Sequence, residues 1–222
     1  PDIDGPMTAR RADAMINGGR VWLKDSVLQR YEENPEIDAA PHRWPEGRWM
    51  VAPSYKGEWG FEAMTRVGRN LLLTDIRSVH KGVPETEIYH CWTHALHQAD
   101  VDTLDLEEEN IVEKVERLAS SLMNLTDSLC ALADRLGYER TRSEIFGEDW
   151  DPFRRELFSG SPALLALCRI APVEMSQQAF MERVKDLVEY WNRFKPGSLQ
   201  TILRKLGCED PAVPKLKSAK LL

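Results

Sequence analysis

The sequence predicts a mostly α-helical protein: a helical bundle with one long heptad-patterned helix, preceded by a smaller irregular α+β part. Three observations lead to this fold class. Apolar residues recur at heptad spacing between residues 106 and 136. Capping residues and glycine stops delimit further helices after residue 83. Before residue 84, glycines, prolines and tryptophans interrupt the periodic patterns, which is typical of short elements joined by loops.

Length and composition limit the classes of protein. A chain of 222 residues allows one large domain or two small ones. The 29 basic residues against 36 acidic ones give a formal net charge of −7, which disfavours long-range attraction to nucleic acid or anionic lipid. The most apolar stretch, 162–173, is too short to span a bilayer. The four cysteines include no CxxC pair, which suits buried thiols in a reducing compartment, although a disulfide pair stays compatible with the sequence. We therefore expect a cytoplasmic protein.

The chain divides into four segments by composition. Residues 1–6, ahead of Met7, are interpreted as a cloning remnant or an excision point in a longer chain. Residues 7–83 form the irregular, tryptophan-rich α+β part. Residues 84–207 form the predicted helical bundle, and residues 208–222 are a tail of interleaved basic and apolar residues.

In the N-terminal part, the sequence predicts few secondary-structure elements clearly. Residues 20–24 alternate between polar and apolar, as a strand does, and a short helix is expected to follow through Tyr31. Residues 34–48, with three prolines, are predicted to be a loop. Residues 49–52 form the next strand candidate, and residues 70–79 fit either a strand or a helix, because short apolar runs do not separate the two.

A helix is predicted from Pro84 to about Ala99. Proline suits the first helical position, and the acidic residues Glu85 and Glu87 suit the positive end of the helix dipole. This helix carries three of the five histidines, and His80 precedes it closely.

One face of that helix predicts a metal site as one of two alternatives. Steps of 3, 4 and 3 residues place Glu87, His90, His94 and His97 on a single face, where imidazoles at i and i+4 can share one ion. A divalent transition metal is the expected cofactor, with zinc as the first choice. A ligand from another segment would complete the set, taken from His80, Asp75 or His42. The alternative is that this face is ordinary polar surface, since HxxxH alone is a weak motif.

The heptad pattern is the strongest in the sequence. Asp105 and Glu108 form a predicted capping box, Gly137 a predicted stop, and a helix between them would be roughly 45 Å long. Its apolar residues follow spacings of 4 and 3: Ile111, Val115, Leu118, Leu122, Leu125, Leu129, Leu132 and Leu136. A second helix, capped by Ser176, repeats this spacing at Phe180, Val184, Leu187, Trp191 and Phe194. We expect the two to pack together within the chain, and a dimeric coiled coil is the alternative.

Shorter helices are expected in the remaining gaps. Asp151 and Pro152 start one that runs through Leu157, and Ser161 and Pro162 start another that runs through Ile170. Ser198 caps a last one that runs through Leu206.

No nucleophile, P-loop or dinucleotide motif is present in the sequence, and no catalytic residue is assigned. The first functional hypothesis is therefore a non-catalytic interaction or assembly subunit of an intracellular complex, which binds a protein partner or itself. Its expected contact residues lie in the tryptophan-rich loops and on the heptad helix: Trp44, Trp49, Trp59, Leu122, Leu125 and Leu129.

Two alternatives belong to other functional classes. A metal-dependent helical-bundle enzyme would use the glutamate and histidine face described above, with a metal-bound water. A single-stranded nucleic-acid-binding protein would stack bases on aromatic rings beside basic side chains, and its expected residues are Arg43, Arg48, Trp49 and Lys56.

Overall fold

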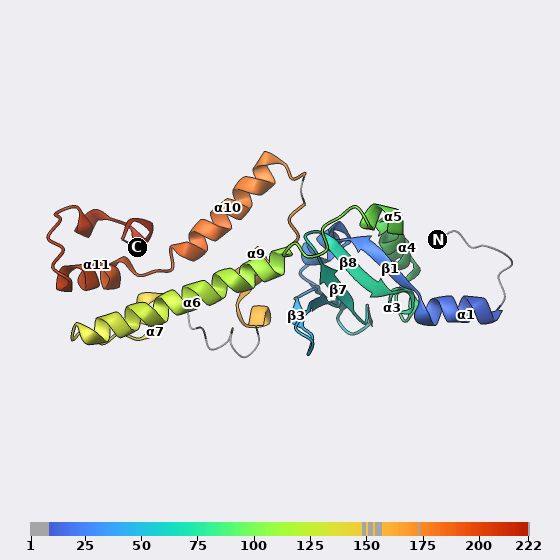
Figure 1. Ribbon diagram of the computed structural model, residues 1–222, viewed down its shortest axis with the longest axis horizontal. Helices are drawn as coiled ribbons and strands as arrows, with labels where there is room; N and C mark the ends of the chain where they lie inside the picture. Colours follow the sequence, from blue (N-terminus) through green and yellow to red (C-terminus); the bar gives the residue numbers. More distant parts are fainter. Residues whose placement is uncertain (1–8, 148–149, 151–152, 154–156, 173, 222) are drawn as a thin grey trace. The chain divides into compact units, whose positions relative to one another are not determined.

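A computed structural model describes residues 9–147, 150, 153, 157–172 and 174–221 (Figure 1). The chain forms two compact units. Unit 1 comprises the residues up to Lys114 together with Cys168–Glu174, and unit 2 comprises Val115–Leu167 and Met175–Leu222. The first boundary between the two units lies after Lys114.

Unit 1 is built on two antiparallel sheets. The larger sheet has six strands in the order β3-β4-β7-β8-β1-β9, and the smaller has three in the order β2-β5-β6. The strands are β1 (Arg20–Lys24), β2 (Ile37–Asp38), β3 (His42–Arg43), β4 (Trp49–Val51), β5 (Ser54–Tyr55), β6 (Trp59–Gly60), β7 (Met64–Val67), β8 (Leu71–Asp75) and β9 (Ala95–Leu96). The strands predicted at 20–24 and 49–52 are confirmed, and the predicted loop at 34–48 contains two strands of two residues each.

Short helices precede, connect and follow these strands. They are α1 (Ala9–Gly18), the 3-10 turn η1 (Asp25–Leu28), α2 (Gln29–Glu32), α3 (Ile76–His80), α4 (Glu85–Thr93) and α5 (Gln98–Val101). The segment 70–79, predicted to be either a strand or a helix, contains one of each. Strand β8 ends at Asp75, and helix α3 begins at the next residue. The helix predicted from Pro84 to Ala99 is shorter than expected: it ends at Thr93, and the chain then enters β9, which pairs with β1.

One face of the larger sheet forms the core of unit 1. Side chains alternate between the two faces of a strand, so Val21 and Leu23 of β1 point to the same side as Leu72 of β8. All three are buried, together with Met64 of β7. Helical residues cover this face, among them Val27, Leu28, Tyr31, Val79 and Cys91.

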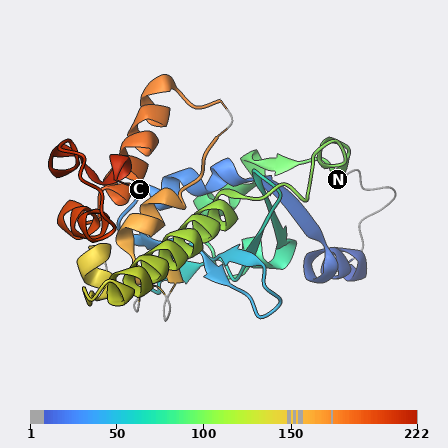
Figure 2. The same ribbon diagram turned by 60° about the vertical axis from the view of Figure 1, so that its left-hand side comes forward.

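Unit 2 contains one long helix and several short ones. α6 (Ile111–Arg135) begins at the end of unit 1 and continues through unit 2 without a break (Figure 2). The others are α7 (Arg142–Ile145), η2 (Leu157–Gly160), α9 (Pro162–Leu167), α10 (Gln177–Trp191), α11 (Pro196–Lys205), η3 (Val213–Lys215) and η4 (Ser218–Lys220). The helix predicted to start at Asp151 and Pro152 lies largely outside the described residues. Within the part of the chain that the structure describes, every helix is too short or too polar to cross a membrane.

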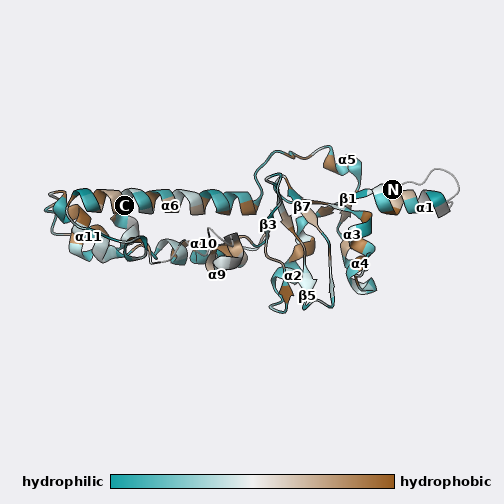
Figure 3. Cartoon of the chain, turned by 90° about the horizontal axis from the view of Figure 1, so that it is seen from below, coloured by the Kyte–Doolittle hydropathy of each residue, from teal (hydrophilic) through white to brown (hydrophobic). Residues whose placement is uncertain are grey.

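Local capping sets the ends of α6. Asn110, rather than Asp105, is the N-cap: its side-chain oxygen accepts hydrogen bonds from the amides of Val112 and Glu113, at 3.0 and 3.1 Å. The Glu113 carboxylate in turn accepts the Asn110 amide at 2.8 Å, which completes a capping box. The predicted stop at Gly137 is confirmed, because this glycine has a φ of +65° just after the last turn. α6 carries hydrophilic and hydrophobic residues along its whole length (Figure 3).

The predicted helical bundle and the predicted mostly α-helical class are both wrong. Two antiparallel sheets make up the N-terminal part, and α10 packs mainly against the short helix α9. Of the α10 residues expected to pair with the long helix, Phe180 and Leu187 are exposed and Val184 and Trp191 are half-buried. Phe194, which follows α10, is buried in the aromatic cluster around Phe146. Heptad spacing marks a helix with one apolar face, but it does not specify which surface covers that face.

Aromatic residues make the core of unit 2 instead. Phe146 stacks on Trp150 with 4.9 Å between the ring centroids, and it meets Phe194 edge to face at 4.8 Å. Tyr190 of α10 packs against the same ring at 5.6 Å. All four side chains are almost completely buried. Phe146 and Phe194 also form an isolated β-bridge, so this cluster joins the segment after α7 to the segment after α10.

Candidate functional site

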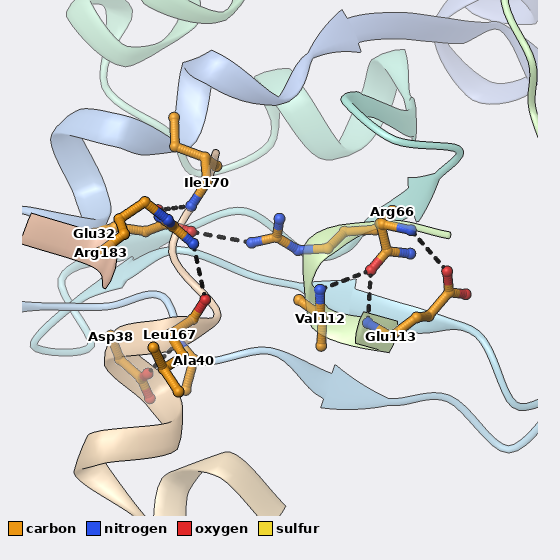
Figure 4. Close-up of polar contacts among 10 residues, drawn as sticks. Glu32, Asp38, Ala40, Arg66, Val112, Glu113, Leu167, Ile170 and Arg183 are labelled. Carbon is orange, nitrogen blue, oxygen red and sulfur yellow. Dashed lines mark hydrogen bonds and ion pairs between the residues drawn. The ribbon is translucent and has the colours of Figure 1, made fainter. Parts of the chain in front are cut away.

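A buried group of charged side chains lies beneath the sheet of unit 1 (Figure 4). Arg66 points from β7 into the core, and its guanidinium donates to the carboxylate of Glu32 at 3.0 Å. The other oxygen of Glu32 accepts the amide of Ile170 at 2.7 Å, which fastens the segment 168–174 to unit 1. Asp25 is buried nearby, and Arg66 and Glu32 both act on it electrostatically. The group is a structural anchor, because Glu32 joins the side chain of Arg66 to the backbone of Ile170.

Burial shifts the pKa values of the two carboxyl groups, those of Asp25 and Glu32. It raises the pKa of Asp25 from 3.8 to about 6, because desolvation of the carboxylate outweighs the attraction of Arg66. Burial also raises the pKa of Glu32, again against the lowering effect of Arg66. Both carboxyl groups therefore bind a proton more tightly in the folded state than in the unfolded chain.

Unit 1 is expected to lose stability as the pH rises from 4 to 6. The raised pKa of Asp25 means that its protonated form favours folding below pH 4, and this contribution of about 3 kcal/mol is lost as the pH passes 6. Asp25→Asn should therefore be more stable than the wild type at pH 7 and equally stable at pH 4. Urea unfolding followed by tryptophan fluorescence measures this difference. The exposed Asp100→Asn is the control, and an equal gain in both variants at pH 7 would contradict the assignment to Asp25.

The predicted metal-binding residues do not all lie on one helix, although the ring centroids of His90 and His94 are 4.7 Å apart. Because α4 ends at Thr93, His94 is its C-cap, and His97 is the N-cap of the next short helix. Glu87 is buried, and its two oxygens accept hydrogen bonds from Arg30 and from the hydroxyl of Tyr31, both at 2.8 Å.

The histidines of this segment bind backbone and indole groups. His90 donates from Nε2 to the carbonyl of Val27 at 3.0 Å, and His94 donates from Nδ1 to the carbonyl of His90, also at 3.0 Å. His80 accepts the indole N–H of Trp92 at 3.2 Å. Among the described residues, no group of three or more His, Cys, Asp or Glu side chains is placed to hold a metal ion. The geometry therefore gives the metal hypothesis no support.

Cys91 lies beside this group but is a poor nucleophile. It is fully buried, and burial raises the pKa of its thiol to about 12. At neutral pH the thiolate, which is the reactive form, is therefore scarce.

The residues predicted to bind nucleic acid lie in different environments. Trp49 is buried under the sheet, so its ring faces are covered, and the guanidinium of Arg43 lies 5.7 Å from its ring centroid. Lys56 forms an ion pair with Glu36 at the tip of the β5–β6 turn. Arg48 is exposed. The exposed indole in this region is that of Trp44 rather than that of Trp49.

Of the predicted partner-binding residues, only Trp44 is an exposed side chain. Trp59 is half-buried against Tyr31 and Phe61. Leu122 of α6 is buried, and the next two predicted contacts on the same helix, Leu125 and Leu129, are half-buried.

Among the described residues, α10 instead carries the largest group of exposed large apolar side chains. Four of its side chains are between 43% and 54% exposed: Phe180, Met181, Leu187 and Val188. The sequence contains the signal for this face, namely the repeated spacing of 4 and 3, which predicted internal packing.

A shallow depression on the outer face of the larger sheet is the other feature that the sequence did not reveal. It has a volume of about 200 Å³ and is lined entirely by residues of unit 1.

Comparisons of this chain with protein-family models, with curated proteins and with solved structures find no match. The apolar face of α10 and the depression on the larger sheet are therefore the two candidate binding surfaces among the described residues.

Proposed function

We propose that this chain is a non-catalytic interaction subunit that binds a partner protein through the apolar face of α10. The observation that carries the proposal is that four apolar side chains of this face are exposed, while its other two, Val184 and Trp191, are half-buried. Residues at steps of three and four lie on one side of a helix, and the face consists of Phe180, Met181, Val184, Leu187, Val188 and Trp191. Contiguous exposed apolar surface of this kind is typical of protein interfaces.

α10 is held in place by its other side. Tyr190 is buried in the aromatic core of unit 2, and Ser176 caps the helix by accepting the amide of Ala179 at 3.2 Å. Arg183 donates to the carbonyl of Leu167 in α9 at 3.0 Å. The apolar face is therefore presented by a helix whose conformation is already fixed, which lowers the entropic cost of binding.

The spacing of the face indicates the kind of partner. Phe180, Val184, Leu187 and Trp191 follow one another at steps of 4, 3 and 4, which suits packing against another helix. The two aromatic residues at the ends are the side-chain types that most often anchor an interface. A helical segment of another protein, or of a second copy of this chain, fits this pattern.

The proposed complex is intracellular. All four cysteines are free, and two of them are buried. Free cysteines of this kind suit a reducing compartment.

Photo-crosslinking tests the proposal directly. A photoreactive amino acid replaces Val188 on the apolar face in one protein, and Glu189, which points away from that face, in the control. Both positions are exposed, so only the direction of the side chain differs. In the cells that express this chain, we expect crosslinked adducts between position 188 and the partner. Mass spectrometry of the adduct then identifies the partner as a second copy of this chain or as another protein. Equal adducts from both positions, or none from position 188, would contradict the proposal.

Charge on this face is expected to abolish the complex. Leu187→Glu with Val188→Glu places two carboxylates where the partner packs, which should weaken binding by at least about tenfold. Helical content and unfolding should be unchanged, because both side chains are about half exposed in the free protein. Light scattering after size exclusion measures the mass of the complex. The control is Glu182→Lys on the opposite face, which should leave that mass unchanged.

A further inference from the structure

The outer face of the larger sheet carries a row of side chains fixed by strand register. Met50 of β4 pairs with Thr65 of β7, and Thr65 pairs with Leu73 of β8. Directly paired residues in an antiparallel sheet point to the same side. These three side chains therefore form the floor of the depression, on the face opposite to the buried core.

The same rule places polar side chains at both ends of this floor. Arg20 of β1 pairs with Asp75 of β8, two positions beyond Leu73, so both project from the outer face. At the other end, the amide of Trp44 donates to the carbonyl of Arg48 at 2.9 Å across the β3–β4 turn. The depression is lined by these residues together with Glu46, Ala63 and Thr74.

The charged side chains at one end of the floor form an ion pair, whereas, among the described residues, the arginine at the other end does not. Arg20 and Asp75 lie 3.8 Å apart and neutralise each other. Arg48 is exposed and, within the described part of the chain, has no carboxylate within ion-pair distance. Its planar guanidinium is suited to a carboxylate or a phosphate, which it can bind through two parallel hydrogen bonds.

Trp44 adds a second recognition element beside Arg48. Its side chain is 48% exposed, and an exposed indole can stack on a flat ligand. Glu46, on the same turn, supplies an acceptor for an N–H group of such a ligand. The volume of about 200 Å³ is smaller than the 300 to 1,000 Å³ that is usual for whole drug-sized ligands, so it suits a single ring.

We infer that this depression binds a planar aromatic ring that carries one anionic group. The ring stacks on Trp44 above the floor formed by Met50, Thr65 and Leu73, and the anion pairs with Arg48. A nucleoside monophosphate and an aromatic carboxylate both have this chemistry. The site lies in unit 1, and it is independent of the α10 interface proposed for unit 2.

Fluorescence titration with AMP and adenosine tests the inference, and isothermal titration is used for indole-3-acetate and indole, whose own fluorescence overlaps that of tryptophan. The anionic probes are AMP and indole-3-acetate, and the matched neutral probes are adenosine and indole. We expect saturable binding of at least one anionic probe, with at least about tenfold weaker binding of its neutral analogue. Saturation by AMP alone would identify a phosphate ligand, and saturation by indole-3-acetate alone a carboxylate ligand. Saturation by neither, or equal binding of the neutral analogues, would overturn the inference.

Variants locate the binding on the sheet. Arg48→Gln and Trp44→Ala should each raise the dissociation constant by at least about tenfold, and both side chains are exposed, so the fold should not change. The control is Arg77→Gln, an exposed arginine on α3 that does not line the depression. Protein NMR or isothermal titration provides a second readout for Trp44→Ala, whose fluorescence differs from that of the wild type. Unchanged affinity in Arg48→Gln would overturn the assignment.

Discussion

Arg66→Met is expected to cost unit 1 about 3 to 5 kcal/mol at neutral pH, which is enough to unfold a marginally stable domain. Arg66 is the cation that faces two buried carboxyl groups, Glu32 at 3.0 Å and Asp25, which Arg66 attracts electrostatically. Without it, both buried carboxylates lose their main counter-charge, and Glu32 keeps only the weaker attraction of Arg169 and its hydrogen bond from the amide of Ile170. Urea unfolding monitored by circular dichroism measures the loss.

The pH dependence and a second substitution separate this mechanism from simple loss of packing. Lowering the pH lets the carboxyl groups take up protons, so the destabilisation should shrink towards pH 4. Adding Glu32→Gln to the variant should recover part of the lost stability, since one uncompensated charge is removed. Arg69→Met is the control, because Arg69 pairs with Glu108 at the surface and such pairs contribute less than about 1 kcal/mol. Equal losses in the two arginine variants would contradict the role of Arg66.

Phe146→Ala is expected to destabilise unit 2 by about 3 to 5 kcal/mol. The Phe146 ring is completely buried and contacts three other aromatic rings, from Trp150, Tyr190 and Phe194. Its removal leaves a cavity in the only aromatic cluster that links α7 to α10 among the described residues. Thermal unfolding and near-ultraviolet circular dichroism measure the loss of stability and of fixed aromatic packing.

Another phenylalanine of the same unit is the matched control. Phe180 on α10 is 54% exposed, so Phe180→Ala should change the stability by less than about 0.5 kcal/mol. The same variant should weaken the proposed α10 complex, whereas Phe146→Ala acts on folding. If Phe180→Ala were as destabilising as Phe146→Ala, α10 would pack through its apolar face, and the proposed interface would be wrong.

Capping and stop signals were readable from the sequence where they involve neighbouring residues. Ser176 caps α10, and Gly137 follows α6 with a positive φ, as predicted. The start of α6 was placed several residues too early, because Asp105 and Glu108 match the same capping pattern as Asn110 and Glu113. A local pattern that occurs twice in one segment cannot by itself select between the two positions.

The residues of the depression were only partly predictable from the sequence, and the buried pair of Glu32 and Arg66 was not predictable. Arg48 and Trp44 were named for different functions, and the depression that they share depends on the turn that pairs them. Its floor comes from three strands whose register is fixed by long-range pairing, and strands of two to four residues carry too little periodicity to predict it. The buried pair of Glu32 and Arg66 joins residues 34 positions apart and has no sequence signature.

By itself, the sequence determined the helices with strong caps and one apolar face, because hydrogen bonding and side-chain spacing within a helix involve residues at most four positions apart. It therefore identified both α6 and the apolar face of α10. Only the tertiary structure decided what covers each face. Phe146 and Tyr190 form the core of unit 2, while Phe180 and Val188 stay exposed. The hydrophobic effect is non-directional, so an apolar face specifies burial but not a partner, and the choice of partner depends on the packing of distant segments.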